Sequence, residues 1–257
     1  INLKNEKILQ KIFERFKPDT VYHIAGQPGV LYSFKNPKSY KINNTHVTKI
    51  ICKVCKKNKI NNFIFASSSS VYGDQKKFPI KENNTLRPVN YYAKTKLRSE
   101  EIIYRTFSHT KINFIIFRFF TVYGPFGRPD MFIHKLLNSI KLNKTIKVHN
   151  RGLNFRDFTY IEDVIKILKI CLKKKLNKQI INICRSKPIR TDKIINLILK
   201  FLKKKNIKLK MTKFIKGEML KTHGSNLKLQ KYIGKFKFTN LNIGLKKTVE
   251  YYKKYGC

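Results

Sequence analysis

Two short stretches of the chain combine side chains that could carry out acid–base chemistry. FASSSSVYG, residues 65–73, places four hydroxyls after a hydrophobic run, and Tyr92 precedes Lys96 by four residues. Residues four apart share one face of a helix, so an ammonium at Lys96 would favour the phenolate of Tyr92 and make it a usable general base. The spacing alone also fits an ordinary surface pair on a lysine-rich helix.

The pattern around these stretches predicts the elements that would position them. Strands are expected at 21–25, 63–66 and 112–120, and helices at 38–58 and 90–107. Continuous apolar strands that alternate with helices are typical of a parallel sheet covered on both faces, here a doubly wound, Rossmann-like α/β fold. Ligands of such sheets bind at the carboxyl ends of the strands. The serine run lies at such an end, which favours ordered hydroxyls over a flexible connector.

The second half of the chain has shorter elements after Gly124-Pro125. Helices are expected at 131–142, 163–173, 191–204 and 241–255, and strands at 145–148 and 180–184, the last of which could rejoin the sheet. The pattern predicts two interleaved domains. Residues 1–120 and 157–184 would form the Rossmann-like domain, and residues 121–156 and 185–257 a smaller α/β substrate domain.

The composition is strongly basic, with 57 Lys and Arg residues against 14 Asp and Glu and a net charge of +43. Such a charge suits a polyanion, and weak binding to nucleic acid at low salt is expected. The lysines are spread over all segments, however, together with abundant Asn and Ile, and no nucleic-acid-binding motif appears. We therefore expect no specific nucleic-acid partner.

Two further classes of protein are disfavoured by the sequence. It contains no apolar span long enough for a membrane helix and no signal-like start, so we expect a soluble, cytoplasmic protein without a membrane partner. Cys52 and Cys55 form a CxxC without a second pair. We expect them to be two small residues on a buried helix face, and we predict no metal site.

Five motifs occur in order along the chain. They are HIAGQPGV (23–30), FASSSSVYG (65–73), YAKTK (92–96), RFFTVYGPFGRPDM (118–131) and RDFTYIEDV (156–164). Together they resemble the extended short-chain dehydrogenase/reductase family of NAD-dependent nucleotide-sugar epimerases and dehydratases, and within it most of all the UDP-glucuronate 4-epimerases.

The resemblance implies a tightly bound NAD, a UDP-sugar substrate and a catalytic set of Ser68, Tyr92 and Lys96. Tyr92 would take the proton of the sugar 4-hydroxyl while a hydride moves from carbon 4 to the nicotinamide. The 4-keto sugar would then rotate and receive the hydride on its other face. Ser68 would hydrogen-bond the 4-oxygen, and Lys96 would hold the cofactor ribose and tune Tyr92.

The remaining site residues follow from the same resemblance. Cofactor contacts are expected at Ala25, Gly26, Gln27, Asn44, Ser67, Tyr92, Lys96 and Phe119. Substrate contacts are expected at Ser68, Ser69, Ser70, Thr121, Arg128 and Arg156, where the two guanidinium groups would face the nucleotide diphosphate. Relatives commonly dimerise through the helices that correspond to 42–58 and 92–107, so a homodimer is expected.

Single positions separate the subfamilies. Ser69 and Ser70 stand where dehydratases and decarboxylases carry acidic residues, so simple epimerisation is favoured, and these hydroxyls could receive the sugar carboxylate. Thr121 is typical of hexuronate epimerases, whereas Leu31 stands where those enzymes usually carry Arg. The expected reaction is conversion of UDP-glucuronate to UDP-galacturonate, with a UDP-hexose 4-epimerase as the alternative.

The glycine-rich phosphate loop of the family does not occur in the sequence, nor does the acidic residue that holds the adenosine ribose. The resemblance therefore implies a truncated Rossmann-like domain without its first βαβ unit, and the chain by itself is expected to be inactive. A degenerate, non-catalytic fragment that persists as a binding module is a further alternative.

Overall fold

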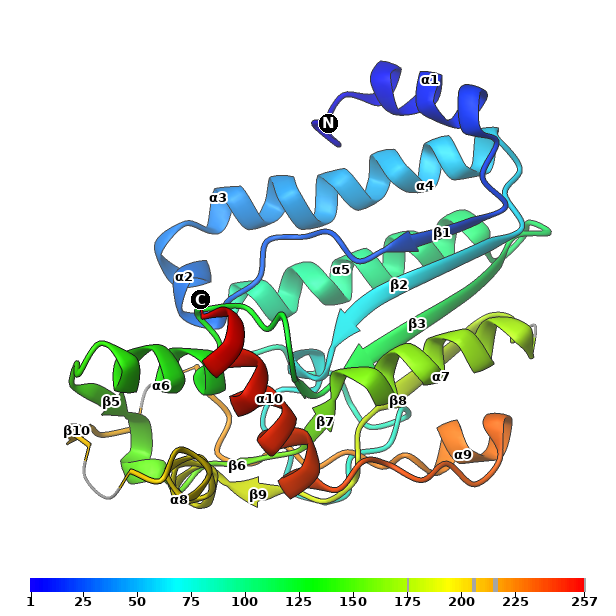
Figure 1. Ribbon diagram of the computed structural model, residues 1–257. Helices are drawn as coiled ribbons and strands as arrows, with labels where there is room; N and C mark the ends of the chain where they lie inside the picture. The colour runs from blue at the N-terminus through cyan, green and yellow to red at the C-terminus, as the bar shows by residue number, and fades with distance from the viewer. Residues whose placement is uncertain (175, 205–206, 215–216, 257) are drawn as a thin grey trace. The chain divides into compact units, whose positions relative to one another are not determined.

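The computed structural model describes residues 1–174, 176–204, 207–214 and 217–256 (Figure 1). Its contacts divide the chain into two compact units. The first comprises Ile1–Lys76, Lys81–Phe119 and Cys171–Asn182, and the second comprises Lys77–Ile80, Phe120–Ile170 and Ile183–Cys257. Residues 157–170 therefore group with the second unit. Which unit would bind a nucleotide cofactor and which a sugar stays a prediction.

The first unit is built on a four-stranded sheet in the order β1-β2-β3-β8. Its strands are β1 (Thr20–His23), β2 (Asn62–Ser68), β3 (Asn113–Phe119) and β8 (Gln179–Ile183). β1 pairs with β2 and β2 with β3 in parallel, with Ser67 opposite Arg118. The parallel sheet is confirmed, and the segment predicted at 180–184 does rejoin it.

The helices of the first unit follow the expected alternation with the strands. They are α1 (Glu6–Phe16), α2 (Val30–Lys35), α3 (Pro37–Tyr40), the π-helix η1 (Lys41–His46), α4 (Val47–Lys57), the 3₁₀-helix η2 (Ser69–Tyr72) and α5 (Tyr91–Phe107). The helix expected at 38–58 is thus continuous from α3 to α4 but contains a wider π turn. The Asn90 side chain caps α5 by accepting from the Ala93 N–H.

Both faces of this sheet are covered, as a doubly wound fold requires. Phe63 and Phe65 on β2 belong to one apolar core together with residues of α1, α4 and α5, which include the buried Cys52 and Cys55. On the opposite face, Ile64 lines a small pocket together with Leu172 of α7 (Ile161–Lys173). In Figure 1, α4 and α5 run along one side of β2 and β3.

The second unit consists of short paired strands and helices. The strands pair as β4 (Thr121–Tyr123) with β7 (Phe158–Tyr160), β10 (Leu209–Met211) with β5 (Ile146–Val148), and β6 (Phe155–Arg156) with β9 (Ile189–Arg190). The helices, besides α7, are α6 (Phe132–Lys141), η3 (His149–Gly152), α8 (Thr191–Leu202), α9 (Leu227–Ile233) and α10 (Leu241–Tyr255). Residues of α6, α8 and α10 share one apolar core.

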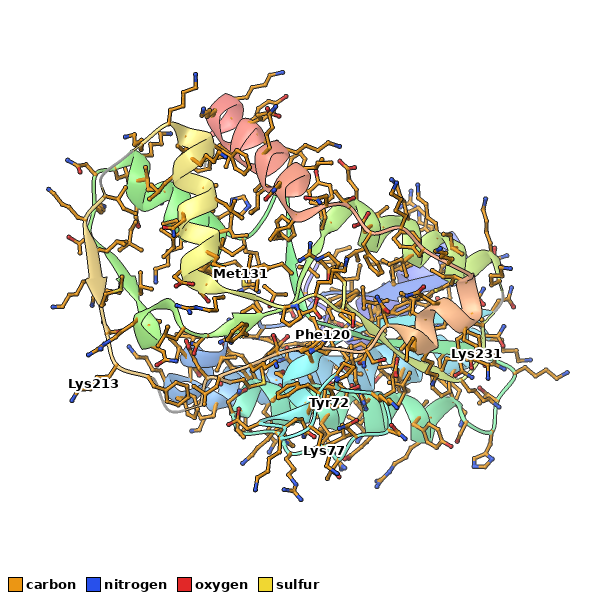
Figure 2. The ribbon with its side chains drawn as sticks, turned by 90° about the horizontal axis from the view of Figure 1, so that it is seen from below. Tyr72, Lys77, Phe120, Met131, Lys213 and Lys231 are labelled. Atoms are coloured by element: carbon orange, nitrogen blue, oxygen red, sulfur yellow. The ribbon has the colours of Figure 1, made fainter. Side chains whose placement is uncertain are left out.

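The surface is rich in lysine in both units. Lys77, Lys213 and Lys231 are exposed, and their side chains extend away from the backbone (Figure 2). Among the residues that the structure describes, no helix is both long and apolar enough to cross a bilayer.

Gly73 ends η2 in a backbone conformation that favours glycine. Its φ is 62° and its ψ is −154°, and a Cβ at this position would lie 1.8 Å from the carbonyl oxygen of Arg87. We expect Gly73→Ala to lower the free energy of unfolding by about 1–3 kcal/mol or more, because conformational strain and a backbone clash act together.

The measurement is urea denaturation, with Gly234→Ala as the matched control. Gly234 also has a positive φ of 84°, but nothing lies within 4 Å of the point that a Cβ would occupy there, so only the conformational cost remains. Equal losses in the two variants would contradict the role of the Arg87 contact.

Candidate active site

The serine run is an ordered end of β2. Ser67 and Ser68 are its last residues, and Ser68 caps η2, its Oγ accepting from the Ser70 N–H at 3.2 Å and the Ser70 Oγ at 2.9 Å. Ser69 and Ser70 are buried. Because Ser70 donates to Ser68, the Ser68 hydroxyl keeps its own proton for another acceptor. The run is therefore no flexible connector.

Tyr92 and Lys96 lie on the first turns of α5, four residues apart as predicted. The Lys96 Nζ donates to the carbonyl oxygen of Ala66 at 2.8 Å and lies 4.8 Å from the ring centroid of Phe65. The Tyr92 ring packs edge-on against Tyr40, with 6.3 Å between centroids. The predicted helix face thus does meet the exit of β2, two residues before Ser68.

The environment of Lys96 alters its acidity. Only 6% of the residue is exposed, and burial lowers the pKa of Lys96 to about 8, while the charge of Glu100 raises it. Burial and the charge of Lys96 lower the pKa of the adjacent His23 to about 3, so His23 is neutral at physiological pH. A lysine with a lowered pKa in a buried position is typical of functional sites.

Asn44, in the middle of η1, hydrogen-bonds to Gln27, which lies just after the end of β1. The Asn44 Oδ1 accepts from the Gln27 N–H at 2.6 Å, and its Nδ2 donates to the Gln27 carbonyl oxygen and to Thr95 Oγ1, both at 3.0 Å. A Cβ on Gly26 would lie 2.9 Å from Asn44 Oδ1 and 3.5 Å from Lys96 Nζ. Ala25 and Gly26 are exposed. Gly26, Gln27, Asn44 and Lys96 therefore come together around one strand exit.

Two other predicted cofactor residues lie at strand ends. Phe119 ends β3 and is partly buried, with its ring centroid 6.2 Å from that of Phe117. Ser67 is 3% exposed and its hydroxyl donates a hydrogen bond to Glu100, so this side chain is already engaged within the protein.

The predicted substrate residues of the second unit have local partners. The Thr121 N–H donates to the Asp157 carbonyl oxygen at 3.0 Å. Arg128 pairs with Asp130 at 2.5 Å, and Arg156 donates to the Phe155 carbonyl oxygen at 2.9 Å and lies 4.0 Å from Glu218. That these side chains contact a substrate stays a prediction.

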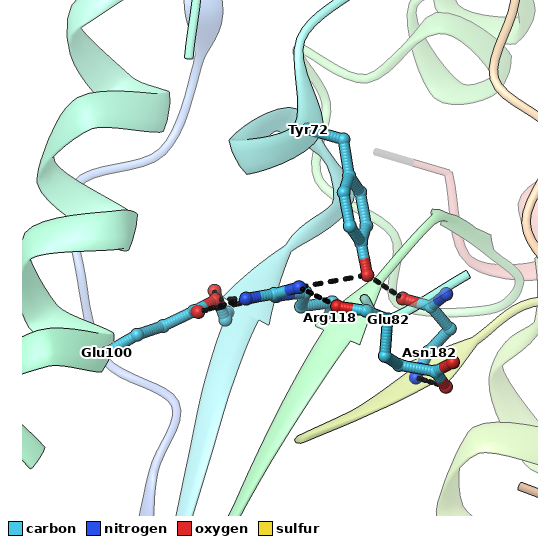
Figure 3. A network of polar contacts seen from close by, with 6 residues as sticks. Tyr72, Glu82, Glu100, Arg118 and Asn182 are labelled. Atoms are coloured by element: carbon cyan, nitrogen blue, oxygen red, sulfur yellow. Dashed lines mark hydrogen bonds and ion pairs between the residues drawn. The ribbon is translucent and has the colours of Figure 1, made fainter. Parts of the chain in front are cut away.

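Sequence reasoning missed the buried pair of Glu100 and Arg118. Their closest atoms are 2.7 Å apart, and the side chains are 4% and 2% exposed. The Arg118 Nη1 also donates to the Tyr72 hydroxyl at 3.0 Å (Figure 3). A signal was present, because Glu100 follows Lys96 by four residues and therefore shares its helix face. In a chain with 14 acidic residues, an acid at that position was notable.

Asp157 was also missed as a polar anchor of the second unit. Its side chain is fully buried and accepts from the Arg185 N–H at 3.1 Å and the Gly224 N–H at 3.2 Å. Burial raises the pKa of Asp157 to about 7 from 3.8, although these donors oppose the shift. The carboxyl group joins segments that are far apart in sequence, so its role is structural.

This shift gives a pH dependence of stability. Because the folded protein binds the Asp157 proton more tightly than the unfolded chain, the stabilisation is complete below about pH 4 and is lost as the pH rises to about 7. In urea denaturation, we expect the unfolding free energy of the wild type relative to Asp157→Asn to fall across this window, by at most about 1.4 kcal/mol per pH unit. Altered hydrogen bonds in the variant add only a pH-independent offset. A difference that rises with pH would contradict the shift.

No group of three or more His, Cys, Asp or Glu side chains that could hold a metal ion occurs in the part of the chain that the structure describes. The four cysteines within it are buried and free. The arrangement at the strand exits instead offers an amine, a phenol and a hydroxyl, the groups that a proton-transfer site needs.

Comparisons with known proteins agree with this class of fold. Residues 1–184 match the model of the NAD dependent epimerase/dehydratase family. The chain therefore belongs to this family.

Three similar proteins narrow the comparison. An uncharacterized protein of Methanocaldococcus jannaschii is 38% identical over 96% of this chain and 72% of its own length. UDP-glucuronate 4-epimerase 4 of Arabidopsis thaliana is 34% identical over 99% of this chain, which spans 62% of that enzyme. The crystal structure of the UDP-glucuronic acid 4-epimerase of Bacillus cereus, in complex with UDP-glucuronic acid and NAD, has a TM-score of 0.92 and 32% identity, covering 99% of this chain and 80% of that one.

Proposed function

We propose that the protein is an NAD-dependent nucleotide-sugar 4-epimerase that converts UDP-glucuronate to UDP-galacturonate. The observation that carries the proposal is the contact of Lys96 with the exit of β2. Its Nζ lies 2.8 Å from the Ala66 carbonyl oxygen, so the helix face of Tyr92 and Lys96 meets the strand that ends in Ser68. Similarity to UDP-glucuronate 4-epimerases supports the choice of sugar.

The exit of β1 fits a dinucleotide cofactor. The exposed backbone at Ala25 and Gly26 allows close approach, and Asn44 holds Gln27 in place from both sides. Lys96 would donate to the cofactor ribose, and Phe119 would pack against the cofactor. Ser67 would contribute through its backbone, since its hydroxyl is donated to Glu100. NAD would accept the hydride from carbon 4 of the sugar and return it.

The side chains of the protein would transfer the proton of the sugar and stabilise the charge that develops on the 4-oxygen. Tyr92 would take the proton of the sugar 4-hydroxyl, assisted by the positive charge of Lys96. Ser68 would donate to the 4-oxygen, and Ser70 already orients the Ser68 oxygen. Ser69 and Ser70 offer no carboxyl group for a dehydration, which favours epimerisation. Further substrate contacts are proposed for Ser69, Ser70, Thr121, Arg128 and Arg156.

The test measures whether the full-length protein converts two nucleotide sugars. With NAD present, UDP-glucuronate is expected to yield UDP-galacturonate, detected by chromatography, and UDP-glucose is expected to be a poor substrate. A second candidate is a 4-epimerase of neutral UDP-hexoses, favoured by Leu31, which is apolar and 42% exposed. Turnover of UDP-glucose alone would select that candidate, and turnover of neither would reject both.

We also propose a cytoplasmic homodimer that assembles through the helical segments at 42–58 and 92–107. This face is basic, because Lys49, Arg98 and Arg105 line one pocket on it. Two such faces would repel each other, so the dimer fraction measured by light scattering is expected to rise with salt. A monomer at all salt concentrations would reject this assembly.

A further inference from the structure

A buried polar cluster lies behind the serine run. It joins Ser67 at the end of β2, Glu100 on α5 and Arg118 on β3. All three residues are at most 4% exposed. Among the ion pairs of the described residues, the pair of Glu100 and Arg118 is the buried one; every other pair is at least 20% exposed at both partners. A buried ion pair is weak evidence for stability, so its retention suggests another role.

The register of the sheet brings these groups together. Ser67 and Arg118 are direct neighbours on β2 and β3, so both side chains protrude on the face that α5 covers. The Glu100 Oε1 accepts from the Ser67 hydroxyl and from Arg118 Nε at 3.1 Å, and Oε2 accepts from Arg118 Nη2 at 2.7 Å. The Glu100 carboxylate thus forms hydrogen bonds with both β2 and β3.

Arg118 is fixed in turn from its far side. Its Nη1 donates to the Tyr72 hydroxyl at 3.0 Å and to the Glu82 carbonyl oxygen at 3.1 Å, and Tyr72 donates to Asn182 Oδ1 at 2.7 Å (Figure 3). The guanidinium is therefore hydrogen-bonded on both of its sides. Because Arg118 is held in this way, Glu100 is held in place as well.

The same helix face carries the proposed catalytic groups. Glu100 follows Lys96 by one helical turn and Tyr92 by two, and Lys96 and Glu100 hold the consecutive residues Ala66 and Ser67. Ser68 is next in the chain. The end of β2 is therefore hydrogen-bonded to α5 at two consecutive residues. They directly precede Ser68, the residue proposed to contact the sugar oxygen.

Glu100 also supplies negative charge to Lys96. Within the described residues, Tyr92 shares the helix face of Lys96, and His23 on β1 is near enough for the charge of Lys96 to lower its pKa, so His23 is neutral at physiological pH. Arg118 on β3 is engaged by Glu100. Burial disfavours the ammonium of Lys96, and Glu100 opposes this effect.

We propose that Glu100 is a positioning residue that acts through Ser67 and Lys96: it fixes the position of Ser68 relative to the Tyr92 face of α5, and its carboxylate, one helical turn from Lys96, favours the ammonium form of that side chain. The proposal rests on the proposed function for its catalytic consequence. Its electrostatic part concerns the free protein and holds without it.

The test uses two variants of the full-length protein. Glu100→Gln combined with Arg118→Met removes both charges and leaves no unpaired buried ion, so it is expected to fold. Ser67→Ala removes the contact between β2 and Glu100 but keeps both charges. Urea denaturation and NAD binding establish that each variant is folded, and neither variant is expected to lose NAD affinity by more than about threefold, which is under 1 kcal/mol.

The first readout is the acidity of Lys96 in the free protein. Competitive amine labelling, resolved by peptide mass spectrometry, gives the pH at which Lys96 becomes reactive, expected near 8 in the wild type. This midpoint is expected to fall by roughly half a pH unit or more in the double variant, because the charge of Glu100 opposes the effect of burial on Lys96, whereas Arg118 is not among the charges that act on it. It is expected to be unchanged in Ser67→Ala. An unchanged midpoint in the double variant would overturn the electrostatic role. If that variant does not fold, Glu100→Gln combined with Arg118→Gln, which also leaves no buried ion, decides the point by the same midpoint.

The second readout separates positioning from binding. Ser67→Ala is expected to lower kcat by roughly three- to tenfold with an unchanged KM for the nucleotide sugar, because only the alignment of Ser68 changes. A wild-type kcat in this variant would overturn the positioning role. If the wild type turns over no nucleotide sugar, the proposed function fails, while the labelling result still decides whether Glu100 controls Lys96.

Discussion

Tyr92→Phe is expected to lower kcat for the proposed epimerisation by about 10²–10⁴-fold while NAD and the nucleotide sugar still bind. The phenol oxygen is the only atom removed, and the ring contact with Tyr40 remains. Because Tyr92 is the proposed acceptor of the 4-hydroxyl proton, the loss falls on the chemical step. Initial rates with UDP-glucuronate, together with NAD affinity by calorimetry, measure the two effects separately.

The neighbouring tyrosine gives a matched control. Tyr91 lies on the same helix turn, but the residue four positions later is Thr95, so Tyr91 has no lysine at the required spacing. Tyr91→Phe is expected to retain kcat within about twofold, a difference under 1 kcal/mol. Equal losses in the two variants would show that the helix start, and not the Tyr92 phenol, limits the reaction.

Arg118→Met is expected to lower the free energy of unfolding by about 3–5 kcal/mol. Methionine fills part of the same space, but Glu100 then stays buried at 4% exposure, with the Ser67 hydroxyl as its remaining partner from this cluster. Tyr72 and the Glu82 carbonyl oxygen each lose a donor as well. Urea or guanidinium denaturation followed by circular dichroism measures the change.

Two further variants test whether the expected loss of stability comes from the burial of the ion pair or from breaking an ion pair as such. Arg128→Met breaks an exposed pair with Asp130 at 2.5 Å and is expected to cost no more than about 1 kcal/mol, because solvent screens the charges. Adding Glu100→Gln to Arg118→Met is expected to restore most of the lost stability, because no buried charge then lacks a partner. A small loss in Arg118→Met, equal to that in Arg128→Met, would contradict the buried character of the pair.

The elements of the fold were largely predictable because their signals are local. Apolar strands, amphipathic helices and their turns were placed within a few residues, and the final helix at 241–255 has the predicted bounds. The short helices α2 and α9 were not predicted, and the π turn η1 inside a helix leaves no sequence pattern that distinguishes it from an α turn. Their conformations depend on packing.

Some features of the candidate site were likewise predictable from local sequence. The spacing of Tyr92 and Lys96 on one helix face follows from the helix repeat, so sequence alone determined it. The family motifs likewise indicated the chemistry of the serine run. The roles assigned to individual site residues remain proposals.

By itself, the sequence determined the order and type of the main elements and the family of the protein. Only the tertiary structure decided which polar groups are buried together. Ser67 and Glu100 are 33 positions apart, and Glu100 and Arg118 are 18 apart. Their meeting depends on the parallel register of β2 and β3 and on the docking of α5. Side-chain periodicity is set by the backbone of each element, whereas burial and the resulting pKa shifts arise only when separate elements exclude water from one another.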